Sequence, residues 1–201
     1  MVAFVGQTAP DFTSGAVLAD GSINPSFHFS EETKGKYKIL FFYPLDFTFV
    51  CPSELVALDK RMAEFKAKNT EVIAVSIDSE HTHAAWRRTP LDEGGVGPVG
   101  FTMVADTKHE ICRAYGIEHP EKGVALRGAF VIDQSMQIKS SIINDLPIGR
   151  NVDELLRLID AVQFHEKHGQ VCPANWKPGS AAMTANHDGV KQFLKAHEGQ
   201  L

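Results

Sequence analysis

Two short runs of apolar, β-forming residues, 38–43 and 71–78, have the length and composition of buried strands. Between them, apolar residues recur at helical spacing across residues 52–67. A helix that joins two strands with few polar positions is typical of a right-handed parallel crossover. The pattern therefore predicts an α/β core. The helical apolar positions are Leu55, Leu58, Met62 and Phe65.

The chain continues with a second predicted helix over residues 80–88, which ends at a Thr-Pro pair. A glycine-rich loop at 94–100 then leads into a strand at 101–104. This loop has neither the G-x-G-x-x-G spacing nor the lysine of a phosphate-binding loop. Two further strands, 128–132 and 137–143, flank a turn and predict an antiparallel hairpin. The sheet is therefore expected to be mixed.

The C-terminal part of the chain divides into a helix and an irregular segment. Asn151 is predicted to cap an amphipathic helix that ends near Phe164. From residue 169 onward, Gly, Pro, Ala and polar residues predict an extended arm with a short helix over 188–197. We expect one globular domain over residues 1–165 and a C-terminal arm over 166–201.

Composition narrows the class of protein. With 201 residues, 43% of them hydrophobic and 22% charged, the chain is long enough for one well-buried domain. A net charge of −5 and a pI near 6.0 argue against nucleic-acid binding. Because no apolar run approaches about 20 residues and the N-terminus has no leader pattern, we expect a soluble, cytoplasmic protein that does not bind membranes.

The stretch from residue 43 to residue 52 ends in Cys51 followed by Pro52. Proline suits the first position of a helix, where its missing N–H costs no hydrogen bond, so Cys51 is predicted to lie at a helix N-terminus. Free backbone N–H groups and the helix dipole favour an anion there, and hence a reactive thiolate. Protease, phosphatase and redox chemistry all remain open on this observation alone.

The other cysteines are assigned different roles. Cys112 lies in a predicted short helix, where a buried thiol is expected, and Cys172 lies in the arm, where a resolving thiol is the better interpretation. No two cysteines form a C-x-x-C pair, which argues against a dithiol oxidoreductase.

Histidines and acidic residues offer weaker candidates. The histidine pairs lack the Cys or carboxylate partners of a closed zinc site, so we interpret them as solvated residues of helix faces. Three aspartates fit loop or cap positions and do not suggest a paired-carboxylate site. These residues are His81, His83, His109, His119, His165, His168, Asp106, Asp133 and Asp153.

Pro44, Thr48 and Cys51 fit the P-x-x-x-T-x-x-C signature, and in this respect the chain resembles the peroxiredoxins, which are thiol peroxidases. The resemblance is closest to the typical two-cysteine group, and it extends through residues 126–128, 146–150 and 171–173. It implies a thioredoxin-like fold, with a central mixed β-sheet flanked by helices and an extended C-terminal arm.

The resemblance also implies roles for individual residues. Cys51 would be the peroxidatic thiolate, held by the Thr48 hydroxyl and by Arg127, while Pro44 shields the pocket from water. A guanidinium at this place can stabilise both the thiolate and the charge that develops on the leaving oxygen. The supporting positions, expected to orient Arg127, fall on Glu54 and Arg150.

The implied cycle needs partners but no cofactor. Peroxide would oxidise Cys51 to a sulfenic acid, and Cys172 of the other subunit in a homodimer would then form a disulfide with it. A thioredoxin or thioredoxin-like dithiol would reduce the disulfide. A ring of dimers is expected, and no metal, haem, flavin or nicotinamide is required. A redox-switched holdase chaperone or peroxide sensor is the alternative function, because assembly could couple to the same local unfolding.

Two segments depart from the family pattern of members prone to overoxidation. That pattern has a Gly-Gly-Leu-Gly loop and a Tyr-Phe pair in the terminal helix; this chain has Gly94-Gly95-Val96-Gly97 and Phe193-Leu194. A terminal helix that slows unwinding at Cys51 gives a second peroxide more time to form the sulfinic acid. We therefore expect intermediate sensitivity to overoxidation.

Overall fold

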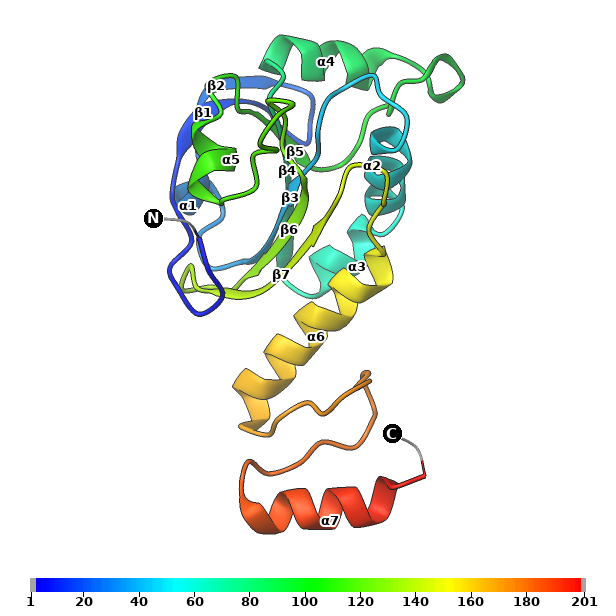
Figure 1. Ribbon diagram of the computed structural model, residues 1–201. Helices are drawn as coiled ribbons and strands as arrows, with labels where there is room; N and C mark the ends of the chain where they lie inside the picture. The colour runs from blue at the N-terminus through cyan, green and yellow to red at the C-terminus, as the bar shows by residue number, and fades with distance from the viewer. Residues whose placement is uncertain (1–2, 200–201) are drawn as a thin grey trace. The chain divides into compact units, whose positions relative to one another are not determined.

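The computed structural model of the protein describes residues 3–199. Its centre is one seven-stranded mixed sheet in the order β2-β1-β5-β4-β3-β6-β7 (Figure 1). The β3/β4 and β4/β5 pairs are parallel and the other pairs are antiparallel. The strands are β1 (Thr13–Val17), β2 (Ile23–His28), β3 (Tyr37–Phe42), β4 (Thr70–Ser76), β5 (Thr102–Ala105), β6 (Arg127–Ile132) and β7 (Ile138–Asn144).

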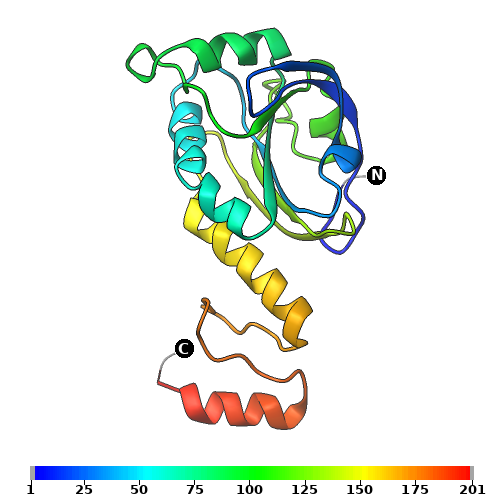
Figure 2. The same ribbon diagram turned by 180° about the vertical axis from the view of Figure 1, so that it is seen from behind.

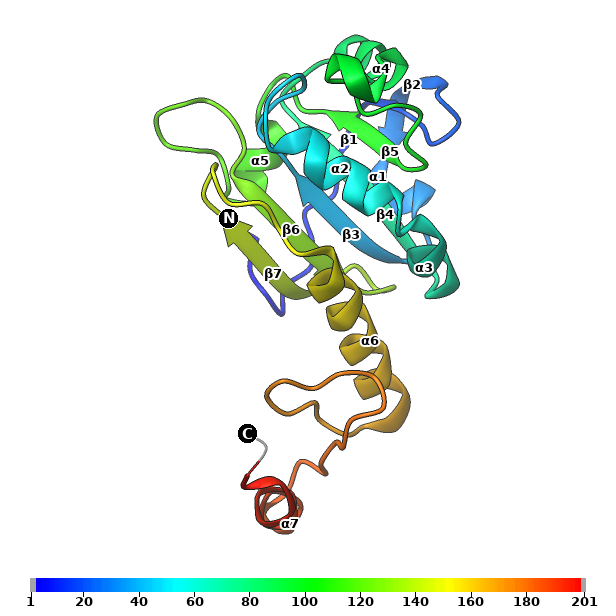
Figure 3. The ribbon, with the colours of Figure 1, turned by 90° about the vertical axis from the view of Figure 1, so that its right-hand side faces the viewer.

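Helices cover both faces of this sheet. Figures 1 and 3 show α2, α3 and α4 on one face, and α1 and α5 on the other. The bounds of these helices are α1 (Phe29–Glu32), α2 (Cys51–Asp59), α3 (Met62–Ala67), α4 (Glu80–Arg88) and α5 (Glu110–Ala114), with a short 3-10 helix, η1 (Leu91–Glu93), after α4.

The predicted parallel crossover is confirmed. Strand β3 pairs with β4 in parallel, with Lys38 opposite Glu71, and the helical segment between them covers one face of the sheet. The prediction of one continuous helix over 52–67 was wrong, because Lys60 and Arg61 separate α2 from α3 (Figure 2). The Arg61 amide bonds the carbonyl three residues back, which tightens the last turn of α2 and ends it.

The central strands are buried on both faces. All six residues of β3 and all six of β6 are buried, and alternate side chains point to opposite sides of the sheet. Leu40 and Phe42 belong to the core on the side of α5, where they join Phe130 and Tyr115. Apolar burial on both faces explains why these strands read as unbroken hydrophobic runs.

The predicted hairpin is also confirmed, and it positions the chemistry. Strand β6 pairs antiparallel with β7 and with β3, so the start of β6 lies beside the end of β3. Arg127 is the first residue of β6 and pairs with Asn144 at the end of β7. Three connections therefore meet at the same end of neighbouring strands: the loop from β3 to α2, the entry to β6 and the exit from β7.

The β1/β2 hairpin was not predicted. Strand β1 contains Ser14 and Gly15, and β2 contains Pro25, residues that weaken a strand pattern. Proline cannot donate a ladder hydrogen bond and is tolerated on an edge strand, and β2 is the edge of this sheet. The first two strands therefore gave no strand signal in the sequence.

The chain forms two compact units, Met1–Val152 and Asp153–Leu201. The division of function between residues 1–165 and 166–201 stays a prediction, and the outermost residues, 1–2 and 200–201, lie outside the described part. Helix α6 (Val152–His168) runs past the predicted end at Phe164, because Gly169 supplies the left-handed backbone (φ 66°) that ends it.

The short terminal helix is confirmed as α7 (His187–His197), and the Asn186 side chain caps it by accepting a hydrogen bond from the Gly189 amide at 2.7 Å. Across residues 3–199, none of the helices combines the length and apolar character that a membrane span requires.

Candidate active site

Cys51 is the first residue of α2 and its side chain is fully buried. The predicted helix start is thus confirmed, with Cys51 itself in the first helical position and Pro52 next. The N-cap residue, Val50, forms no side-chain hydrogen bond to the amides of the first turn, so in the described part of the chain this turn has no side-chain cap. These amides favour an anion at the sulfur.

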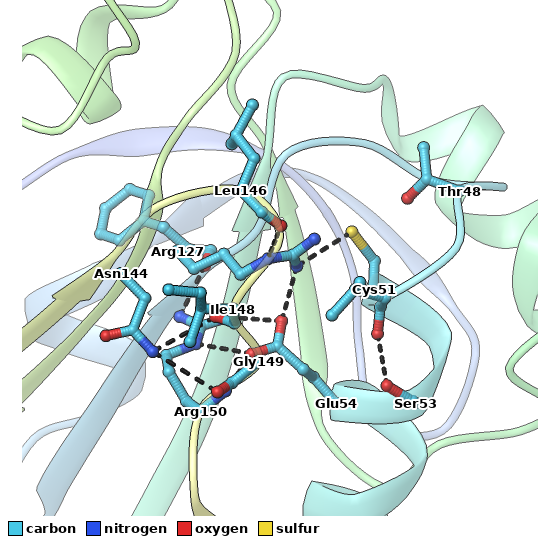
Figure 4. Close-up of polar contacts among 12 residues, drawn as sticks. Thr48, Cys51, Ser53, Glu54, Arg127, Asn144, Leu146, Ile148, Gly149 and Arg150 are labelled. Carbon is cyan, nitrogen blue, oxygen red and sulfur yellow. Dashed lines mark hydrogen bonds and ion pairs between the residues drawn. The ribbon is translucent and has the colours of Figure 1, made fainter.

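Arg127 reaches Cys51 from the start of β6. Its NH1 group donates to the Cys51 Sγ at 3.4 Å and to the Glu54 Oε2 at 2.8 Å (Figure 4). Its Nε donates to the backbone carbonyl of Leu146, in the segment after β7, at 2.6 Å. Hydrogen bonds to helix α2 and to the segment after β7 therefore fix the guanidinium beside the sulfur.

Glu54 lies one turn along α2 from Cys51 and joins two buried arginines. Besides Arg127, it accepts hydrogen bonds from the Arg150 Nε at 2.9 Å, NH2 at 2.9 Å and backbone amide at 2.8 Å. Arg150 NH1 also donates to the carbonyls of Phe42 and Gly128, at 2.7 and 2.6 Å. The Arg150 side chain thus connects the end of β3, the start of β6 and helix α2.

The charged side chains beside Cys51 do not balance one another. Burial lowers the pKa of Arg150, and the neighbouring Glu54 carboxylate opposes that effect. The Arg150 guanidinium also lies 3.3 Å from the centre of the Phe41 ring, a cation–π contact. Two buried guanidiniums face one carboxylate, so one positive charge remains uncompensated. The cluster therefore carries a net positive charge next to the Cys51 sulfur.

Thr48 lies on the other side of the sulfur from Arg127 in Figure 4. Its hydroxyl donates to the carbonyl of Leu45 at 2.9 Å, and the structure assigns no hydrogen bond between it and Cys51 among the described residues. The oxygen of Thr48 is therefore free to accept a hydrogen bond, because its proton is already used. Pro44 is buried at the start of the same loop.

A buried hydrogen-bond network that the sequence did not predict anchors this loop. The Tyr43 hydroxyl donates to the Asp46 Oδ1 at 2.7 Å, and the Asp46 Oδ2 lies 2.8 Å from the His83 Nδ1 on α4. Burial raises the pKa of Tyr43 and the pKa of Asp46. The interpretation of His83 as a solvated residue was wrong, because its ring is fully buried and its Nε2 meets the Val104 carbonyl at 3.1 Å.

Cys112 is fully buried, as predicted. Its Sγ donates a hydrogen bond to the His109 carbonyl at 3.4 Å. Burial, together with the neighbouring Asp106 carboxylate, raises the pKa of Cys112 to about 12. His109, Cys112 and Glu118 place ligand-type atoms within 4.8 Å of one another. Arg113 nevertheless forms two hydrogen bonds to the Glu118 carboxylate, so this set resembles a hydrogen-bonded cluster more than a metal site.

Cys172 differs from the other two thiols in being partly exposed. Its Sγ donates a hydrogen bond to the Ala161 carbonyl on α6 at 3.7 Å. Partial burial raises the pKa of Cys172, whereas the nearby Arg157 guanidinium acts in the opposite direction. All three cysteines are free thiols.

Comparison with known proteins shows which families the chain is similar to. The model of the AhpC/TSA family matches residues 5–141, and the model described as the C-terminal domain of 1-Cys peroxiredoxin matches residues 161–196. The chain is 50% identical over 191 residues to alkyl hydroperoxide reductase C from Buchnera aphidicola. The aligned region covers 95% of this chain and 96% of that relative. It is 48% identical to alkyl hydroperoxide reductase C from Helicobacter pylori, covering 98% and 99%.

Solved structures show the same fold over nearly the whole chain. The crystal structure of reduced Plasmodium vivax 2-Cys peroxiredoxin superposes with a TM-score of 0.92 at 44% identity, and covers 96% of this chain and 99% of that one. AhpC from Enterococcus faecalis superposes with a TM-score of 0.78 at 37% identity, over 86% and 100%. The expected thioredoxin-like arrangement of a mixed sheet flanked by helices is thereby confirmed.

Proposed function

Because the chain belongs to the AhpC/TSA family of peroxide-reducing peroxidases, we propose that Cys51 is the residue that attacks the peroxide. The observation that carries the proposal is the Arg127 guanidinium 3.4 Å from the buried Cys51 sulfur. Arg127, Glu54 and Arg150 together place a net positive charge beside that sulfur. A buried thiolate next to a fixed cation is the nucleophile that a thiol peroxidase needs.

In the first step, the Cys51 thiolate attacks one oxygen of a hydroperoxide, forming an S–O bond as the O–O bond breaks. The sulfur is oxidised to sulfenic acid, and the other oxygen leaves with the electron pair and takes a proton to become water or an alcohol. Arg127 can donate to the departing oxygen as charge develops on it. The Thr48 oxygen can accept the hydrogen bond of the peroxide O–H, and Pro44 helps to exclude water.

In the second step, the thiolate of Cys172 attacks the Cys51 sulfenic sulfur, so that the S–S bond forms as the S–O bond breaks. The hydroxide that leaves takes up the proton released from the Cys172 thiol and becomes water. Because Cys51 is fully buried, the first turn of α2 must unwind before another thiol can reach its sulfur. Partial exposure suits Cys172 for this role, and full burial makes Cys112 unsuitable. A thioredoxin-like dithiol then reduces the disulfide.

We propose a homodimer in which Cys172 serves the Cys51 of the partner, with further association of dimers into a ring. Exposed apolar side chains beside the active-site loop support additional subunit contacts, since Phe49 is 97% exposed and Phe47 is 52% exposed. A reducing cytoplasm is the proposed location, because the cycle begins from free thiols.

One gel tests this cycle. Reduced protein is mixed with one equivalent of hydrogen peroxide, quenched with an alkylating reagent and run without reductant. The wild type is expected to give a disulfide-linked dimer that both Cys51→Ser and Cys172→Ser abolish. Cys112→Ser is the matched control and is expected to keep the dimer. A dimer that persists in Cys172→Ser but disappears in Cys112→Ser would transfer the resolving role to Cys112.

A further inference from the structure

An arginine on α6 holds the segment that carries Cys172. Arg157 NH1 donates to the Trp176 backbone carbonyl at 3.1 Å, four residues beyond Cys172. The same guanidinium forms a two-point ion pair with Glu154, with Nε to Oε2 at 2.6 Å and NH2 to Oε1 at 2.7 Å. All these contacts lie within the second compact unit, Asp153–Leu201.

The ion pair gives Arg157 a fixed orientation. Glu154 lies three residues before it on the same helix, so the two side chains meet on one face. The side chain of Arg157 is 28% exposed, and the planar guanidinium uses two edges for Glu154 and the carbonyl at once. A lysine could not satisfy both partners, because its ammonium is a single point on a flexible chain.

Cys172 lies within the field of this cation. The nearby guanidinium counteracts the effect of partial burial on the pKa of Cys172. The Cys172 sulfur lies 3.7 Å from the carbonyl of Ala161, one helical turn beyond Arg157 on α6, and Arg157 is the charged group that acts on its pKa. The exposed His165 on the same helix meets the Gln170 carbonyl through its Nδ1 at 2.8 Å. On the arm side, Val171 pairs with Met183, and both are apolar. Arg157 is therefore the cation that favours a thiolate at this position.

We propose that Arg157 is a positioning residue for the resolving half of the cycle, which holds Cys172 through the Trp176 carbonyl and favours its thiolate form. This inference depends on the resolving role of Cys172 proposed above. The attacking species in disulfide formation is the thiolate, so the rate at a given pH follows the thiolate fraction. No new reactant is required: Cys172 supplies the electron pair and the Cys51 sulfenic acid supplies the leaving hydroxide.

Three variants of α6 separate charge from anchoring. Arg157→Gln removes the positive charge but keeps a side-chain amide that can donate to the Trp176 carbonyl. Arg157→Lys keeps the positive charge but loses the planar guanidinium that bonds Glu154 and this carbonyl at once. Lys167→Gln is the matched control, because it removes an exposed cation from the last turn of the same helix. Each variant is reduced and rapidly mixed with hydrogen peroxide, and both Cys51 oxidation and disulfide formation are followed from pH 6 to 9.

We expect Arg157→Gln to slow disulfide formation about three- to tenfold near neutral pH, a modest effect because solvent partly screens the charge of Arg157. The midpoint of its pH profile is expected to rise by roughly half to one pH unit, while the rate of Cys51 oxidation is unchanged. Above that midpoint Cys172 is a thiolate in both proteins, and the more basic thiolate of the variant is the better nucleophile. The rate deficit of Arg157→Gln is therefore expected to shrink at high pH. Arg157→Lys is expected to keep the midpoint of the wild type.

An Arg157→Gln profile that coincides with the Lys167→Gln profile would overturn the proposal. A deficit of equal size at every pH, with an unmoved midpoint, would also overturn it, because it would show a structural contact without influence on the thiolate. Cys172→Ser, run in parallel, separates this inference from its premise. If Cys172→Ser loses the disulfide, the resolving role of Cys172 stands, independently of the result for Arg157. If the disulfide persists in Cys172→Ser, the resolving role of Cys172 and the positioning role of Arg157 are both refuted.

Discussion

Cys51 and Cys112 are both fully buried, and both lie in the first turn of a short helix, yet charges of opposite sign surround them. At Cys51 the Arg127 guanidinium donates to the sulfur. At Cys112 the sulfur itself is the donor, and the Asp106 carboxylate accepts hydrogen bonds from the amides of Ile111 and Cys112. The helix amides that could favour a thiolate at Cys112 are thus already paired with a carboxylate.

This contrast shows that burial and helix position do not by themselves make a thiol reactive. Burial disfavours any thiolate, and a helix start helps only if its amides are free and a cation compensates the charge. Cys51 meets both conditions, and Cys112 meets neither. We therefore expect Cys51 to react and Cys112 not to react, because a guanidinium lies beside the first and a carboxylate beside the second.

The largest expected effect separates the two cysteines directly. Cys51→Ser is expected to reduce peroxide turnover at least about a thousandfold, because it removes the nucleophile. Cys112→Ser, which replaces one small buried donor by another, is expected to stay within about twofold of the wild type. Steady-state peroxide consumption with a dithiol reductant measures both. Equal losses in the two variants would erase the contrast.

Glu54 tests the charge balance around Cys51 through stability. Glu54→Gln is expected to lower the free energy of unfolding by about 3–5 kcal/mol, because it leaves two buried guanidiniums without their anion. Glu64→Gln on α3 is the matched control: it also faces an arginine, Arg61, but its side chain is half exposed, and a loss of at most about 1 kcal/mol is expected. Urea unfolding of the reduced proteins measures both, and similar losses would contradict the account.

Arg127 tests the cation itself. Arg127→Lys keeps a positive charge but cannot serve the Cys51 sulfur, Glu54 and the Leu146 carbonyl together, so kcat/KM for peroxide is expected to fall about 10²- to 10³-fold. The control Arg113→Lys changes an exposed arginine paired with Glu118, and little change is expected. An unaltered kcat/KM in Arg127→Lys would show that any nearby cation suffices.

The smallest effect concerns the titration of Cys112. In the Cys51→Ser, Cys172→Ser double variant, Cys112 is the remaining cysteine of the sequence. Because its pKa is raised from 9.0 to about 12, the folded protein retains the proton as pH rises past 9.0, and deprotonation favours opening. Its alkylation rate is expected to increase about tenfold per pH unit from pH 7 through pH 10. A plateau near pH 9 would contradict the raised pKa.

Sequence reasoning predicted the parts of the fold that have a periodic signal. The crossover from β3 to β4 and the β6/β7 hairpin followed from apolar runs and turn residues, and the helix start at Cys51 followed from Pro52. The β1/β2 hairpin was missed because Pro25 and Gly15 obscure its strands. The bend at Lys60 was missed because the buried face continues unbroken from α2 into α3.

The site was predictable only in part. Spacing identified the Cys51 turn, but only the family resemblance indicated Arg127, since nothing local marks it as a partner of α2. The antiparallel pairing of β3 with β6 is the missing signal, because that register places the start of β6 at the end of β3. The contact between Asp46 and His83 had no sequence signal at all: a loop and a distant helix meet only in the folded chain.

Peroxide is expected to oxidise Cys51 and not the equally buried Cys112. The most direct test uses the Cys172→Ser variant, in which the sulfenic acid cannot be resolved. Reduced protein is given one equivalent of hydrogen peroxide in the presence of dimedone, and the adduct is located by peptide mass spectrometry. We expect an adduct on Cys51 and none on Cys112; an adduct on Cys112 with Cys51 unmodified would show that Cys112 is the thiol that reacts with peroxide.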